Sequence, residues 1–204
     1  MHKRHLTASA LLASALVLTG CGSGSSSDQT VNSAGSGASS SAETDKGNDA
    51  DVAFLTGMKP HHEQAVEMSD MVLGANPPTA VAAIAQQIKG AQDPEIAQMT
   101  TMLADLGVES DAGGHSTGSG MDMGMAGHEG MMSEAMMSTL DAATGTEAAR
   151  LYLEGMVRHH QGAIKASDTE IADGQYAPAI ALAQKIKTAQ QAEITEMQAL
   201  IESL

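Results

Sequence analysis

Apolar side chains recur at alternating intervals of four and three residues in the first half of the chain, a spacing that puts them on one face of a helix. One series predicts a helix over about 51–73, and the next predicts a helix over about 78–106. Gly74-Ala75-Asn76-Pro77 between them is a strong turn, Pro78 suits a first helical position, and Gly107 suits a helix end. The two helices should therefore be antiparallel neighbours. The two stripes comprise Phe54, Met58, His61, Ala65, Met68 and Val72, then Val81, Ala85, Ile88, Gln92, Glu95, Met99, Met102 and Leu106.

The second half repeats the first at an offset of 98 positions without a gap. Gly57-Met58-Lys59-Pro60-His61-His62 returns as Gly155-Met156-Val157-Arg158-His159-His160. We expect a third helix with Thr146 as its N-cap that ends before Asp173-Gly174, and a fourth that begins near Pro178. Neither helix pair can bury its stripe alone, so the sequence predicts an all-α, ferritin-like four-helix bundle. It is built of two repeated hairpins, over about 49–107 and 146–204.

Two prolines fall inside the predicted helices. Pro60 and Pro94 each remove a backbone hydrogen bond and crowd the preceding turn. Their repeat counterparts are Arg158 and Ala192, so the fold does not depend on proline there. We expect a kink at each position rather than a helix end.

The N-terminus has the features of an export signal. A basic start precedes a short apolar run over 6–18, which ends in Leu18-Thr19-Gly20-Cys21 and resembles a bacterial lipobox. The resemblance implies a signal peptide over 1–20 and a lipid on Cys21. The Ser/Gly-rich residues 21–48 would then be a disordered, flexible tether to the membrane. The expected location is the outer face of the cell membrane, the periplasm or the cell envelope; the alternative is an ordinary signal peptide with an incidental cysteine.

Composition excludes several classes of function. A net charge of −15 argues against nucleic acid as a partner, and the single cysteine excludes an internal disulfide or a cysteine-based metal cluster. No Ser-His-Asp arrangement or phosphate-binding loop points to hydrolysis or nucleotide use.

The joint between the halves, over about 108–145, is rich in methionine and glycine. Its glycines oppose a stable helix before Ser133, after which a short helix to about Ala143 is expected. Methionine in such a setting has no core to fill, whereas several thioethers together can bind a large soft cation. The candidate ligands in the joint are Met121, Met123, Met125, His128, Met131 and Met132.

Polar side chains also interrupt the inward stripes, at equivalent places in both hairpins. Met58 precedes His61 by three residues and His62 by four, so sulfur and imidazole can project together. Folding back around Asn76 would set His62 near Gln92 and Met58 near Glu95. Thioether and imidazole donors suit copper, above all Cu(I). The predicted ligands are Met58, His61, His62, Met156, His159 and His160, supported by Gln92, Glu95, Gln190 and Glu193.

These inward-facing polar residues of both hairpins are called the histidine layer below, and three interpretations of the layer stay open. The first is a protein that sequesters Cu(I) or passes it to a copper-transfer partner. The second is a ferritin-like redox enzyme with iron or manganese, although such sites need a Glu three residues before a His, and none occurs here. The third is a metal-free interaction module in which His–Glu and His–Gln hydrogen bonds fix the helix register. Whether the histidines form one site or two, the relative direction of the first and third helices, and the oligomeric state all stay open.

With these residues in view, the chain resembles the bacterial family called domain of unknown function 305. The resemblance covers about 51–204 and is carried by the doubled Met-x-x-His-His phrase, the segment 91–99 and Gly130-Met131-Met132-Ser133. The family implies a ferritin-like helical fold, and some members resemble extracytoplasmic copper-binding proteins. At Ala166-Ser167 the chain departs from a Met-Ala pair common in the family, which implies a weaker second site.

Overall fold

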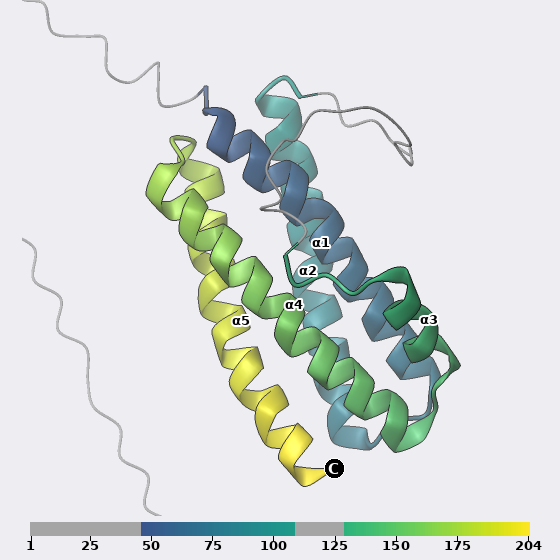
Figure 1. Cartoon of the computed structure of the whole chain (residues 1–204). Helices are drawn as coiled ribbons and strands as arrows, with labels where there is room; N and C mark the ends of the chain where they lie inside the picture. Colours follow the sequence, from purple (N-terminus) through teal and green to yellow (C-terminus); the bar gives the residue numbers. More distant parts are fainter. Residues whose placement is uncertain (1–45, 109–128) are drawn as a thin grey trace, which may run out of the picture. The chain divides into compact units, whose positions relative to one another are not determined.

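The computed structural model describes residues 46–108 and 129–204, which are helical apart from short connections. Within these residues the chain forms five helices (Figure 1). The all-α architecture is confirmed, and so is the short helix in the joint. Cys21, Met121, Met123, Met125, His128 and the predicted signal peptide lie outside the described residues. The helices are α1 (Asp49–Gly74), α2 (Thr79–Asp105), α3 (Glu134–Ala142), α4 (Gly145–Asp173) and α5 (Ala177–Ser203).

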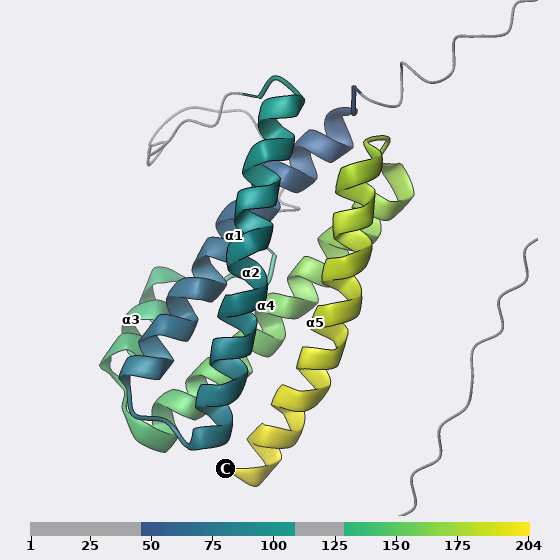
Figure 2. The same ribbon diagram turned by 180° about the vertical axis from the view of Figure 1, so that it is seen from behind.

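The four long helices pack as two hairpins laid side by side. α1 packs on α2 and α4 packs on α5, while α1 also lies beside α4 and α2 beside α5 (Figures 1 and 2). The start of α1 meets the end of α4, where Asn48 Nδ2 donates to the Asp173 carbonyl oxygen at 2.8 Å. The end of α1 meets the start of α4, where Gly145 N donates to the Ala75 carbonyl oxygen at 2.7 Å. α1 and α4 are therefore antiparallel, which the sequence had left undecided.

Helix starts differ in detail from the sequence-based prediction. α4 begins at Gly145 with Thr144 as its N-cap, so the prediction of Thr146 was wrong. The reason is local: Gly145 tolerates its φ of 57° and anchors its N–H on Ala75. Pro78 is likewise the N-cap of α2 rather than its first helical residue.

One carboxylate, that of Asp51, connects the first turn of α1 to the second hairpin by hydrogen bonds. Asn48 and Asp51 form a reciprocal capping box at the start of α1. The Asp51 carboxylate also accepts hydrogen bonds from the backbone N–H groups of Gln175 and Tyr176, at the start of α5. One buried carboxylate thus accepts hydrogen bonds from backbone N–H groups at the starts of two helices, α1 and α5.

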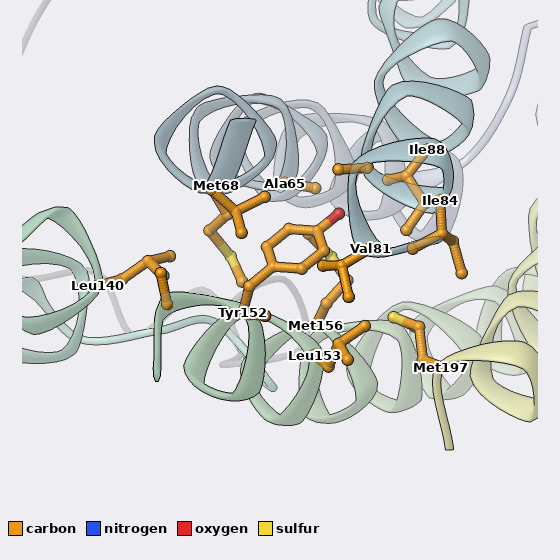
Figure 3. Packing of buried hydrophobic residues seen from close by; sticks show 14 of the residues in the cluster. Ala65, Met68, Val81, Ile84, Ile88, Leu140, Tyr152, Leu153, Met156 and Met197 are labelled. Atoms are coloured by element: carbon orange, nitrogen blue, oxygen red, sulfur yellow. The ribbon is translucent and has the colours of Figure 1, made fainter. Parts of the chain in front are cut away.

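The interior consists of two apolar clusters. One lies around Tyr152, Met156 and the side chains of α3 (Figure 3), and the other lies around Phe54, Leu55 and Met58. The buried polar residues of the four long helices include both histidine pairs, Gln92, Glu95, Gln190 and Glu193. The inward orientation of these residues, predicted from the stripes, is confirmed. Pro60 and Pro94 lie inside α1 and α2 as expected; kinks at these prolines stay a prediction.

Among the described residues, no helix combines the length and the apolar character that a bilayer crossing requires.

Candidate functional site

The centre of the site is a contact between two histidines that occupy the same position in the two repeats. The rings of His61 on α1 and His159 on α4 have centroids 3.6 Å apart and planes inclined by 41°. In two antiparallel helices related by a repeat, a residue meets its own counterpart only on the approximate two-fold axis between them. That axis therefore passes between His61 and His159.

The outer histidines are each bound to a glutamate of their own hairpin. His62 Nε2 lies 2.9 Å from Glu95 Oε2, and His160 Nε2 lies 2.9 Å from Glu193 Oε2. The expected His–Glu bonds are confirmed, but the partner of His62 is Glu95 and not Gln92. With the ring neutral, Nε2 carries the proton toward the carboxylate, and Nδ1 keeps its lone pair. Carboxylates orient metal-binding histidines in this way in many proteins.

Several buried polar atoms of the layer have no hydrogen-bond partner among the described residues. They include both ring nitrogens of His159, Nδ1 of His62 and His160, and both amide atoms of Gln92 and Gln190. The expected His–Gln hydrogen bonds are therefore not formed. Buried polar groups without partners are rare in folded proteins and call for an explanation, such as a bound ion or water. Here they occur at equivalent places in both hairpins.

The interior keeps two of these imidazoles uncharged. Burial lowers the pKa of His159 well below its usual value, and the neighbouring His61, His160 and His62 rings act in the same direction, while the His61 backbone acts against it. Burial also lowers the pKa of His160, although Glu193 acts in the opposite direction. At neutral pH these rings therefore offer lone pairs instead of repelling a cation.

The two glutamates differ in their outer neighbours. Glu95 Oε1 lies 3.2 Å from Lys185 Nζ of the other hairpin, whereas Glu193 Oε1 accepts a hydrogen bond from Gln87 Nε2 at 3.5 Å. Lys185 and Gln87 are repeat counterparts. Burial acts to raise the pKa of Glu95, but His62 and Lys185 together lower it. The layer is thus symmetric in its histidines and asymmetric in its charge.

The predicted sulfur ligands lie in different surroundings. Met58 and Met156 are buried, but they belong to separate apolar clusters. Figure 3 shows Met156 beside Leu153 and Tyr152. Met132 is also buried, with its sulfur packed against Gly155, which is the environment of a core residue. Met131 is partly buried.

A segment of the joint, Glu129–Met132, crosses the central histidine pair. His61 Nε2 lies 3.2 Å from the Glu129 carbonyl oxygen, which fits an N–H donor. Gln64 holds the segment in place, because its side chain both accepts from Met132 N and donates to the Met132 carbonyl oxygen. On the other side, a Cβ at Gly162 would lie 1.8 Å from the Glu129 oxygen, so only glycine fits. Neither Gln64 nor Gly162 was predicted from the sequence, although they are repeat counterparts of unlike type.

Within residues 46–108 and 129–204, no three His, Cys, Asp or Glu side chains are grouped closely enough to hold one metal ion. An ion in the layer would therefore be held by fewer of these groups, by added thioether sulfur, or after a shift of side chains.

The fold and the layer define a class: extended helical hairpins, duplicated in one chain, with paired histidines buried where the copies meet. Comparison of the sequence with family models identifies residues 51–201 as Domain of unknown function (DUF305), and the chain belongs to this family. The family resemblance found in the sequence is confirmed. No match was found among curated proteins.

Solved structures with the same fold come from several sources. A DUF305 fragment from Deinococcus radiodurans is 28% identical, with a TM-score of 0.65, over 77% of this chain and 98% of that one. A "putative secreted protein DUF305" from Streptomyces coelicolor is also 28% identical, with a TM-score of 0.66, over 76% of this chain and 93% of that one. CopM in its Cu(I)-bound form is 22% identical, with a TM-score of 0.61, over 75% of this chain and 96% of that one.

Proposed function

We propose that the protein binds Cu(I) outside the cytoplasm, for sequestration or for transfer to a copper-accepting partner, and that the buried histidine layer holds the ion. The observation that carries the proposal is the set of buried imidazole nitrogens on His62, His159 and His160 that have no hydrogen-bond partner among the described residues. Burial keeps the rings of His159 and His160 uncharged. These residues fit the ion chemically, since imidazole suits copper in general and thioether sulfur suits Cu(I). CopM, which shares the fold, has a Cu(I)-bound form.

The proposed roles follow from the contacts. His61 and His159 would supply the central donors, and His62 and His160 would supply Nδ1, held in that tautomer by Glu95 and Glu193. Gln92 and Gln190 would support the rings from α2 and α5. Met58 and Met156 would contribute sulfur from either side, and Met131 and Met132, with the joint residues outside the described part, would collect the ion.

The location is part of the same proposal. An export signal with a lipid on Cys21 would place the helical domain at the outer face of the membrane, with residues 21–48 as the tether. The Streptomyces coelicolor relative, described as secreted, supports export. A membrane-held metal binder would meet ions as they arrive at, or leave, the cell surface.

The test is a Cu(I) titration of the mature protein against a competing chelator. His159→Gln should weaken binding at least tenfold, because it removes both orphaned nitrogens at the axis. Tyr152→Phe is the matched control: it also removes a buried polar group from α4, and should leave the affinity for Cu(I) unchanged. Equal affinities for the wild type and His159→Gln would refute the proposal.

The absence of a three-residue cluster among the described residues favours a second candidate, a metal-free module whose His–Glu bonds fix the helix register. It predicts that His159→Gln changes stability equally with and without Cu(I). A rise in the wild-type melting temperature on adding Cu(I), absent in the variant, would exclude it.

A further inference from the structure

The two ends of the α1–α4 pair are equivalent by the repeat, but only one of them is filled. At one end, Ser69 Oγ lies 3.1 Å from the Tyr152 hydroxyl, and both polar groups are satisfied. At the other end Phe54 replaces the tyrosine, and Ser167 Oγ, also buried, has no partner among the described residues. The repeat therefore provides an internal reference for what is unusual at the second end.

A cavity of about 60 Å³ lies at that second end, between the start of α1 and the end of α4. This exceeds the roughly 10–15 Å³ that one water molecule requires. Its wall comprises Ala50, Ala53, Phe54, Met58, Ala166, Thr169 and Glu170. At the filled end, Leu151, Met68 and Met71 stand where Ala53, Ala166 and Thr169 stand here, and they pack on the core around Tyr152. The cavity thus arises from shorter side chains, and exposed Ala53 and Thr169 give it a way to solvent.

Two side chains in this wall can bind a cation. Glu170 is 1% exposed and replaces the Val72 of the filled end. No N–H or hydroxyl group of the described residues donates to its carboxyl oxygens, and the polar group that interacts with it is the carboxyl group of Asp51. Met58 is 2% exposed and brings a thioether into the same wall. Asp51 adds a second buried carboxylate beside Glu170, and no ion pair of the described residues involves either acid. At neutral pH the pair therefore holds one proton, on Glu170, and no basic side chain of the described residues balances the charge of Asp51.

We propose that this cavity is a second cation site, in which the Met58 thioether and the Glu170 carboxylate bind a soft monovalent ion such as Cu(I) or Ag(I). Sulfur on an otherwise apolar wall favours a soft ion over a strongly hydrated one, and a monovalent ion that replaces the Glu170 proton leaves the charge of the site unchanged. The site rests on the proposed function for the choice of ion and shares Met58 with it, but Glu170 and the rest of the cavity wall are separate from the histidines. Among the described residues, the equivalent place in the other half is occupied by Leu151, Met68 and Met71.

The test uses Ag(I) alone, which is redox-inert, and follows the protein by NMR with ¹³C-labelled methionine methyl groups and labelled histidine rings. The Met58 methyl signal should move on addition of Ag(I). Glu170→Gln should weaken that response at least tenfold, as should Ala53→Leu, which copies the Leu151 of the filled end and closes the cavity. Glu154→Gln, an exposed change on the same helix, is the matched control and should leave the response unchanged.

The outcomes separate the two sites. A Met58 methyl that stays fixed at saturating Ag(I), or that responds equally in wild type and both variants, overturns the cavity site. In the second case, Met58 belongs to the histidine layer. Histidine rings that do not respond, beside a Met58 that does, overturn the proposed histidine site and leave the cavity site standing. Unchanged far-UV circular dichroism of Ala53→Leu and Glu170→Gln shows that a lost response is not a loss of fold.

Discussion

The first and second hairpins agree in the histidine layer and differ where they meet the rest of the chain. Each supplies one axial histidine, one His–Glu pair and one glutamine amide without a hydrogen-bond partner among the described residues, at matching positions. They differ at Gln64 against Gly162, at Val72 against Glu170, at Tyr152 against Phe54 and at Gln87 against Lys185. Identical positions form the shared centre. Three of the unlike pairs lie beside features that occur once, namely the joint segment and the cavity, and the fourth, Gln87 against Lys185, contacts the two glutamates of the centre from outside.

This comparison teaches which residues a duplicated fold leaves free to change. Packing constrains both copies of a core position equally, so a difference inside the core needs a local cause. The four differences can each be tested by changing one copy toward the other, or by changing only one of the two.

The largest effect is expected at Gly162, which faces the backbone of Glu129. Gly162→Ala should destabilise the fold by about 3 kcal/mol, because the new Cβ would overlap the Glu129 oxygen and neither backbone can move away easily. Urea unfolding measures the change. Gly90→Ala is the matched control: no atom lies within 4 Å of its added Cβ, so it should stabilise α2 by about 0.5–1 kcal/mol. Equal effects of the two substitutions would contradict the close approach of the joint segment.

The next effect concerns pH. Burial, with the neighbouring Asp51 carboxylate, raises the pKa of Glu170 to about 8 from a usual 4.5. The folded state therefore holds this proton more tightly than the unfolded state. Its contribution to stability is complete below pH 4.5 and is lost as the pH rises toward 8, at up to about 1.4 kcal/mol per pH unit.

Glu170→Gln removes the titrating group and should flatten this loss. Melting temperatures between pH 5 and 9, measured with a chelator present, compare the two proteins. The equivalent substitution at the filled end, Val72→Ala, is expected to lower stability by the same amount at every pH. A wild type and a Glu170→Gln variant with parallel pH profiles would show that Glu170 does not carry a raised pKa.

A smaller effect is expected from exchanging the two aromatic residues. Tyr152→Phe removes the hydrogen bond to Ser69 and should cost about 1 kcal/mol. Phe54→Tyr, the reverse change in the other half, would place a hydroxyl near the unpartnered Ser167 and should cost less than Tyr152→Phe or stabilise the fold. Thermal unfolding of both variants gives the answer, and a greater loss for Phe54→Tyr would break the equivalence of the two ends.

The smallest effect is expected at Lys185, whose side chain is largely exposed. Lys185→Gln makes the surroundings of Glu95 like those of Glu193, and should change stability by less than about 1 kcal/mol. The pKa of Glu95 should nevertheless rise, because Lys185 helps to lower it. An NMR titration of the Glu95 carboxyl carbon detects this rise, with Lys187→Gln, which disrupts an ion pair with Asp168 elsewhere, as the control.

Much of the fold was contained in the sequence, because the 98-residue offset and the helical stripes are strong local signals. The inward orientation of His61, His62 and Glu95 followed from those stripes. Pairing within the layer did not, since a difference of one helical turn separates Glu95 from Gln92, and the packing of whole helices decides between them. The backbone partner of His61, from a glycine-rich segment, left no periodic signal at all.

Glu170 could have been found. Its repeat counterpart is Val72, a member of the predicted apolar stripe, so an acid at that position breaks the pattern of the second copy. The cavity beside it could not be foreseen in the same way, because it depends on which short side chains face each other across α1 and α4.

The approximate axis through His61 and His159 has a consequence for ancestry. Because each copy contributes an equal share of the central layer, a half-length polypeptide with one hairpin would rebuild that layer by pairing with itself. Fusion of two such genes would then have freed each copy to specialise. The first copy now binds the joint segment through Gln64, and the second accommodates the same segment at Gly162.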